Sequence, residues 1–122
     1  MGAMSVLVVD DEKDIRELLR IAFLTNGYEV FTATNGVEAL ESIRQEQPSA
    51  VLLDLMMPHM SGYEVVESLR DEGLLDLLPI VILTARNIDE TDQGRLEGVR
   101  AVYQKGATDL NTLVKDLSVA LA

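Results

Sequence analysis

Several short apolar segments of the sequence are each followed by polar side chains of kinds that take part in chemistry. These side chains are Asp10 and Asp11 after 6–9, Asp54 after 50–53, Thr84 after 80–83 and Lys105 after 101–104. Carboxylates bind hard metal ions and attack phosphoryl groups, and hydroxyl and ammonium groups stabilise phosphoryl oxygens. If the segments end side by side, the sequence predicts a metal-dependent phosphoryl-transfer site.

Three carboxylates gathered in one place repel one another strongly. At about 4 Å and an effective dielectric near 20, each like-charged pair costs roughly 4 kcal/mol. Asp10, Asp11 and Asp54 can therefore cluster only if they are protonated or compensated. Mg²⁺ is the ion that fits best, because it binds one or two carboxylates together with water and phosphate oxygens. With the ammonium group of Lys105 it would neutralise the cluster, so that a phosphoryl group could approach.

Five short apolar segments alternate with five helical patterns, and this alternation predicts an α/β fold with a parallel sheet. The segments 6–9, 50–53 and 80–83 are continuously apolar, as central strands covered on both faces are. The segments 29–34 and 101–104 are mixed or short and suit the edges of the sheet. Because ligands of such sheets bind at the carboxyl ends of the strands, the polar side chains stand in the expected place.

The first predicted helix spans 13–26 and stops at Gly27, which can adopt the left-handed conformation that ends a helix. The apolar residues at three-and-four spacing, which we expect to face the core, are Ile15, Leu18, Leu19 and Ala22. The last predicted helix would bury Leu110, Leu113, Val114, Leu117 and Leu121.

Two helix starts have the spacing of a capping box, Asn35 with Glu38 and Ser61 with Glu64. Thr108 is the expected cap of the last helix. The segment 89–97 is the weakest predicted helix, because it contains a glycine and a single firm apolar anchor.

The composition predicts one globular domain. The chain has 122 residues, of which 48% are hydrophobic and 25% charged, against about 150 residues for a typical domain. We expect residues 1–3 to be a remnant of cloning and residues 4–122 to form the domain. The natural protein starts either at Met4 or further upstream in a longer chain.

The charge and the residue types exclude several classes of function. A formal net charge of −11 disfavours direct binding to nucleic acids and to anionic membranes. With no cysteine and one histidine, the chain lacks the usual zinc ligands. No apolar stretch has the length of a membrane span or the pattern of a secretory signal. We therefore expect a cytoplasmic protein with no nucleic-acid or membrane partner.

The segments VLVVDDE at 6–12, LLDLMMPHMSG at 52–62 and ILTAR at 82–86, together with Lys105, resemble the receiver domain of two-component response regulators. The likeness extends from about Ser5 to the end of the chain. It implies a flavodoxin-like fold, a doubly wound five-stranded parallel sheet of order 2-1-3-4-5 with five helices.

The resemblance also assigns roles to residues and implies partners. Asp54 resembles the phosphoacceptor. The implied metal ligands are Asp10 (mostly through water), Asp11, Asp54 and the backbone carbonyl of Met56. The groups implied to hold the phosphoryl group are the Thr84 hydroxyl, the Ala85 amide and Lys105. The implied partners are a sensor histidine kinase or a histidine phosphotransfer protein, and a downstream output protein or domain.

The sequence departs from the family pattern at two positions. Gly106 replaces the proline that usually follows the lysine through a cis bond, so the bond is either trans or held under strain. Val102 stands where the family tends to place a tyrosine or phenylalanine that switches with the threonine. Tyr103 comes one residue later and should face the opposite side of the strand. We therefore expect the signal to be transmitted by backbone shifts or by a partner that reads the loops.

The leading interpretation is a signalling domain, not an enzyme, that takes a phosphoryl group onto Asp54 and changes conformation. It could stand alone, relay phosphate or belong to a hybrid histidine kinase. The alternative is a pseudo-receiver that binds proteins without phosphorylation. A haloacid-dehalogenase-like phosphatase would need a second aspartate where Met56 stands, and the glycine-rich loop of dinucleotide-binding enzymes does not follow the first apolar segment.

Overall fold

A computed structural model describes residues 4–107 and 109–121 of the chain. Its centre is a parallel sheet with the strand order β2-β1-β3-β4-β5. The strands are β1 (Ser5–Val9), β2 (Glu29–Ala33), β3 (Ala50–Leu53), β4 (Ile80–Thr84) and β5 (Ala101–Gln104). The predicted α/β class and strand order are confirmed, and the two segments predicted at the edges, β2 and β5, are the edge strands.

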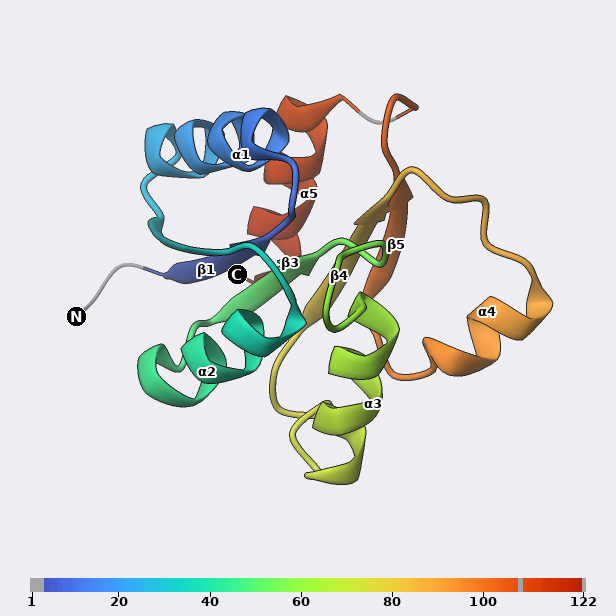
Figure 1. Cartoon of the computed structure of the whole chain (residues 1–122). Helices are drawn as coiled ribbons and strands as arrows, with labels where there is room; N and C mark the ends of the chain where they lie inside the picture. The colour runs from blue at the N-terminus through green and yellow to red at the C-terminus, as the bar shows by residue number, and fades with distance from the viewer. Residues whose placement is uncertain (1–3, 108, 122) are drawn as a thin grey trace.

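Helices cover both faces of this sheet (Figure 1). They are α1 (Lys13–Thr25), α2 (Gly36–Glu46), α3 (Gly62–Asp71), α4 (Glu90–Arg95) and α5 (Leu110–Leu121). Helices α1 and α5 lie side by side on one face, α2 and α3 cover the other, and α4 stands beside α3 at the outer end. Among the described residues, no helix combines the length and apolar character needed to cross a bilayer.

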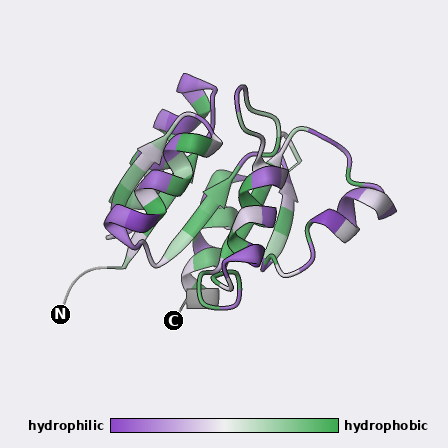
Figure 2. Cartoon of the chain, turned by 60° about the horizontal axis from the view of Figure 1, so that its bottom comes forward, coloured by the Kyte–Doolittle hydropathy of each residue, from purple (hydrophilic) through white to green (hydrophobic). Residues whose placement is uncertain are grey.

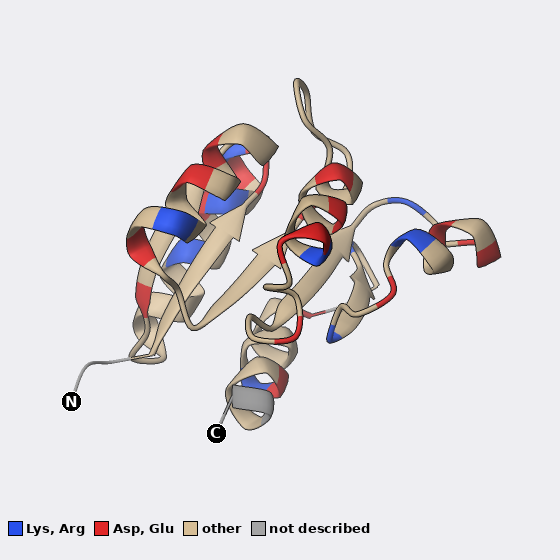
Figure 3. Cartoon of the chain, turned by 90° about the horizontal axis from the view of Figure 1, so that it is seen from below, with Lys and Arg blue, Asp and Glu red and all other residues tan. Residues whose placement is uncertain are grey.

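The core has two layers because successive residues of a strand point to opposite faces. In β1, Leu7 and Val9 pack against α2 and α3, whereas Val6 and Val8 pack against α1 and α5. The strands are accordingly the most hydrophobic part of the chain (Figure 2), and charged residues lie mainly on helices and loops (Figure 3). The buried sheet is therefore a rigid support for the loops at its ends.

Helix α1 corrects one prediction about the core. Leu19 and Phe23 are buried, but Leu18 is 53% exposed. Adjacent positions of a helix point about 100° apart, so Leu18 and Leu19 cannot share one narrow buried stripe. The predicted end is confirmed, because the helix closes at Asn26 and Gly27 has a φ of 87°.

At both predicted helix starts the cap side chain is placed as expected, but the return hydrogen bond from the glutamate that would complete a capping box is not found among the described residues. The Ser61 side chain accepts a hydrogen bond from the backbone N–H of Glu64, and Asn35 does the same for Glu38. The Glu38 carboxylate, however, accepts hydrogen bonds from the N–H and hydroxyl of Thr34 and not from the N–H of Asn35. Glu38 thus stabilises the turn after β2 instead of completing a capping box.

The ends of the chain are described only in part. In α5, the predicted core residues Leu113, Val114 and Leu117 are buried. The predicted cap Thr108, the side chain of Leu121 and the proposed cloning remnant at 1–3 lie outside the described residues.

Candidate functional site

The carboxyl ends of the strands bring the predicted polar residues together. Asp10 follows β1, and Asp54 follows the neighbouring strand β3, where its N–H donates to the Val9 carbonyl at 3.0 Å. Lys105 follows β5, and its N–H donates to the Thr84 carbonyl at 2.7 Å. The strands are all parallel, but the order in which the chain adds them to the sheet reverses between β1 and β3, and this is the place where open parallel sheets bind ligands.

Three carboxylates form the acidic cluster of the site: Asp10, Asp11 and Asp54. One oxygen of each lies within 4.8 Å of those of the other two. Asp10 and Asp54 are 2% and 4% exposed, and Asp11 is exposed at the rim. The prediction that these side chains meet is confirmed. Two of the carboxylates are therefore held largely out of water, where their mutual repulsion is strongest.

Lys105 brings a positive charge into the acidic cluster. Its Nζ lies 2.8 Å from Asp10 Oδ2 and 3.2 Å from Asp54 Oδ2. It also lies 3.4 Å from Oε1 of Glu12, a contact that the sequence motifs do not predict. The ammonium group of Lys105 therefore offsets part of the repulsion among these carboxylates. Its single positive charge cannot neutralise the acidic cluster and Glu12 together, which carry four negative charges.

The ionisation of Asp54 and Lys105 reflects this arrangement. Burial, and then the charge of Asp10, raise the pKa of Asp54 above its ordinary value of 3.8, and Lys105 only partly opposes them. Burial by itself would lower the pKa of Lys105, but its hydrogen bond to Asp10 and the charge of Asp54 outweigh burial and raise it. Lys105 is thus charged at neutral pH, and an ionised Asp54 costs the folded state free energy.

The raised pKa of Asp54 predicts that Asp54→Asn stabilises the metal-free protein at neutral pH. A carboxyl group with a raised pKa binds more protons in the folded state than in the unfolded state, so stability falls as the pH rises through that pKa. The gain in the variant should shrink as the pH is lowered and vanish below the ordinary value of 3.8. Urea denaturation of both proteins in EDTA across this range measures it. A variant less stable than the wild type at neutral pH would contradict the pKa assignment.

The loop after Asp54 passes close to the start of α3, where a glycine is required. A Cβ at Gly62 would lie 2.2 Å from the backbone oxygen of Asp54 and 2.8 Å from the Cα of Leu55. The N–H of Gly62 also donates to the Leu55 carbonyl at 3.0 Å. Gly62 thus sets how closely the loop bends back beneath the predicted phosphoacceptor.

We expect Gly62→Ala to destabilise the fold by about 1–3 kcal/mol, the usual cost of overpacking. The clash is with backbone atoms, which cannot rotate away as a side chain can. Chemical denaturation measures the loss, and Gly94→Ala is the control, since a Cβ there meets nothing within 4 Å. Equal stability of Gly62→Ala and the wild type would show that the loop is not as close as described.

Thr84, at the end of β4, is fully buried. Its Oγ1 accepts a hydrogen bond at 3.2 Å from the backbone N–H of Arg86. Ala85 lies between them and is exposed. The hydroxyl of Thr84 therefore belongs to a tight turn at the mouth of the site, and the contact to Arg86 is one that the sequence did not reveal.

Strand β5 and the turn after it contain the two positions, Val102 and Gly106, at which the sequence departs from the family pattern. Val102 is 42% exposed. Tyr103 packs on the opposite face, among residues of α1 and α5, and its hydroxyl lies 3.4 Å from Asp116 Oδ2. The Lys105–Gly106 bond is trans, and Gly106 has a φ of 81°. Tyr103 therefore does not replace the aromatic residue that the family tends to place on the side of Val102.

The donor set of the acidic cluster fits a hard divalent cation. All three side chains offer carboxylate oxygens, which Mg²⁺ prefers. The turn after β1, which carries Asp10 and Asp11, is also held by Arg16, whose Nη1 donates to the Asp10 carbonyl at 2.8 Å. At Met56, the N–H donates to Asp54 Oδ1 at 3.4 Å, and the residue is 55% exposed. The assignment of the Met56 carbonyl as a ligand stays a prediction.

Comparison with known proteins agrees with this geometry. A family model for the response regulator receiver domain matches residues 6–117. The response regulator MprA of Mycobacterium leprae (strain TN) is 49% identical over 84 residues, which cover 69% of this chain and 36% of that protein. The MprA of Mycobacterium avium (strain 104) is 50% identical over the same shares. The chain thus spans little more than a third of the length of these relatives.

Solved structures extend the likeness to the whole fold. The receiver domain of the Francisella response regulator 1452 is 27% identical, with a TM-score of 0.86 and coverage of 97% of this chain and 96% of that chain. The chemotaxis protein CheY4 of Vibrio cholerae is 32% identical, with a TM-score of 0.85 and coverage of 97% and 98%. Since sequence motifs, fold and acidic cluster all agree with the family match, this chain belongs to the response regulator receiver domains of two-component systems.

Proposed function

We propose that Asp54 accepts a phosphoryl group from the phosphohistidine of a sensor kinase or a histidine phosphotransfer protein. The N–P bond of the phosphohistidine breaks as a bond forms between phosphorus and a carboxylate oxygen of Asp54. The imidazole leaves and takes up a proton, and no oxidant or reductant is needed. The observation that carries the proposal is the position of Asp54, buried between Lys105 at 3.2 Å and two further aspartates.

The groups around Asp54 would help its negatively charged carboxylate to attack a phosphoryl group, which is also negatively charged. Lys105 points its ammonium group at Asp54 Oδ2, where it can stabilise the charge that develops on the transferred phosphoryl oxygens. The hydroxyl of Thr84 and the amide of Ala85 stand at the next strand end and would donate to the same oxygens. Of these groups, the Lys105 ammonium group already lies 3.2 Å from Asp54 Oδ2, so it needs little reorganisation when the donor arrives.

The acidic cluster would hold Mg²⁺. Asp11 and Asp54 would bind it directly, with the Met56 carbonyl, while Asp10 would act mostly through water because Lys105 already takes one of its oxygens at 2.8 Å. The bound ion supplies charge neutralisation, which allows a carboxylate and a phosphoryl group to approach. Cation and lysine together offset the repulsion among the buried acids.

In this proposal the chain is a cytoplasmic signalling domain and not an enzyme acting on a separate substrate. Its partners are the phosphodonor and a downstream output protein or domain. The net charge of −11 favours protein partners over nucleic acids or anionic membranes.

A pseudo-receiver that signals only by protein contact is the less favoured function. It would bury the charges of Asp10, Asp54 and Lys105, at a cost in folding free energy, although its function would not use them. The two functions differ in one experiment. The protein is incubated with acetyl phosphate and Mg²⁺, and its intact mass is measured. We expect an adduct of one phosphoryl group that is absent in EDTA. A folded protein without any adduct would favour the pseudo-receiver.

A further inference from the structure

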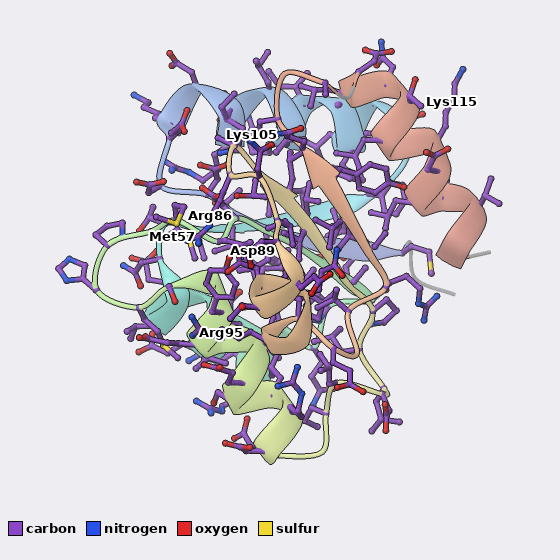
Figure 4. All side chains as sticks on the ribbon, turned by 90° about the vertical axis from the view of Figure 1, so that its right-hand side faces the viewer. Met57, Arg86, Asp89, Arg95, Lys105 and Lys115 are labelled. Atoms are coloured by element: carbon purple, nitrogen blue, oxygen red, sulfur yellow. The ribbon has the colours of Figure 1, made fainter. Side chains whose placement is uncertain are left out.

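Arg86 contacts both the functional site and helix α4. Its backbone N–H donates to Thr84 Oγ1 at 3.2 Å, beside the acidic cluster. Its guanidinium group lies 3.3 Å from Asp92 Oδ2, in α4. Figure 4 shows Arg86 between Lys105 on one side and Asp89 and Arg95 on the other. One residue thus connects the mouth of the site to the helix.

Asp92 depends on this partner more than a surface acid would. Its side chain is only 8% exposed, although Arg86 itself is 44% exposed. Asp92 and Asp89 also form the capping box that starts α4, with Asp89 Oδ1 accepting from the Asp92 N–H at 2.8 Å. Withdrawal of a cation from a buried carboxylate is costly, because the charge is left without compensation. A change at Arg86 therefore bears directly on the start of α4.

Apart from Leu96, which follows the last residue of α4 and is buried in the core, the other attachments of α4 are mostly polar. The helix has six residues, and its Arg95 pairs with Glu67 of α3 at 3.1 Å and lies over the Tyr63 ring at 4.3 Å. Arg70 donates to the backbone carbonyl of Arg95 at 3.0 Å. Such exposed ion pairs are individually weak. The Tyr63 hydroxyl, buried in the same place, has no hydrogen-bond partner among the described residues. Helix α4 is thus held by contacts that a small change of charge can shift.

Phosphorylation would make such a change of charge next to Arg86. A phosphoryl group carries about −1.5 to −2 charges in place of the single charge of the carboxylate. Lys105 is already shared among three carboxylates, so the added charge would favour a further cation besides Lys105 and the proposed Mg²⁺. Arg86 lies two residues after Thr84 in the sequence. Its planar guanidinium group can donate two parallel hydrogen bonds to phosphoryl oxygens.

We propose that Arg86 transmits the phosphorylation state of Asp54 by leaving Asp92 for the phosphoryl group, which loosens α4 from α3. The inference rests on the proposed function and adds how phosphorylation of Asp54 changes the protein surface at α4. It also accounts for a signal that passes without an aromatic residue at Val102, because the route runs through the loop after β4 and not through β5. The surface around Asp92 and Tyr63 is then exposed only in the phosphorylated protein.

Hydrogen–deuterium exchange on the millisecond scale, followed on the peptide that contains 86–97, tests the proposal in the full chain. Exchange is compared with and without acetyl phosphate in the presence of Mg²⁺, and intact mass reports the phosphorylated fraction. In the wild type we expect phosphorylation to speed exchange of the α4 amides by about five-fold, as the loss of one ion pair would. In Arg86→Gln, exchange should be fast in both states and change by less than about two-fold.

Two further variants separate the route from the general stability of α4. Asp92→Asn keeps an oxygen for the capping box but loses the charge, so it should behave like Arg86→Gln. Arg95→Gln breaks the pair with Glu67 but leaves Arg86 in place, so its exchange should be faster overall and still respond to phosphorylation. If phosphorylated Arg86→Gln shows the same change in exchange as the wild type, or if the phosphorylated wild type shows none, the inference is wrong. A wild type that takes up no phosphoryl group would instead contradict the proposed function.

Discussion

Asp54→Asn will take up no phosphoryl group from a phosphohistidine donor or from acetyl phosphate, while the protein stays folded. The amide has nearly the same shape as the carboxylate, so packing around β3 is preserved, but it is a far poorer nucleophile than a carboxylate. The substitution also removes one charge from the acidic cluster, which favours the fold. The rate of labelling, measured by intact mass, should fall below detection, and circular dichroism should be unchanged.

The matched control for this variant is Asp14→Asn. Asp14 is an exposed acid in the first turn of α1 and lies outside the acidic cluster. The Asp14→Asn variant should be labelled at the wild-type rate. This would show that the loss of labelling in Asp54→Asn is specific to Asp54 and does not follow from the removal of any nearby acid. Full labelling of Asp54→Asn would mean that another residue is the nucleophile.

Lys105→Ala should bind Mg²⁺ as the wild type does but be phosphorylated roughly 100-fold more slowly, the usual effect of removing one preorganised charged donor. The side chain is 13% exposed and touches three carboxylates, and no other lysine or arginine among the described residues forms an ion pair with them. The conformational response should weaken as well, because the phosphoryl group loses its principal charge partner. Isothermal calorimetry measures ion binding, and intact mass at saturating Mg²⁺ measures the rate.

Lys115→Ala is the control for the loss of a positive charge, since Lys115 is exposed on α5. Its rate of phosphorylation and its response should match those of the wild type. If Lys105→Ala were phosphorylated at the normal rate and showed a normal response, the role given to the ammonium group would be refuted.

The sequence predicted the fold and the composition of the site because both follow from strong, local signals. Continuous apolar segments mark buried parallel strands, and parallel strands bring their carboxyl ends to one edge. Asp10, Asp54 and Lys105 could therefore be placed together without knowledge of the loops between them. The spacing of these motifs also supplied the resemblance to the receiver family.

The details that the sequence did not predict depend on which of several equivalent partners a side chain meets. Leu18 and Leu19 are equally apolar, and only the packing of α1 against its neighbours decides that Leu18 is exposed. Glu38 has the spacing of a capping box, yet the turn at Thr34 offers it two donors. The pair between Arg86 and Asp92 joins a loop to a helix six residues away, and no periodic pattern indicates such a contact.

Reduction of the phosphorylated protein with borohydride identifies the phosphoacceptor itself, because borohydride converts an aspartyl phosphate to homoserine at the residue that carried it. The protein is treated with acetyl phosphate and Mg²⁺, reduced, digested and sequenced by mass spectrometry. We predict homoserine at position 54, and only there, in the sample with Mg²⁺ and none in the sample with EDTA. Homoserine at another aspartate, or equal conversion in EDTA, would contradict the account.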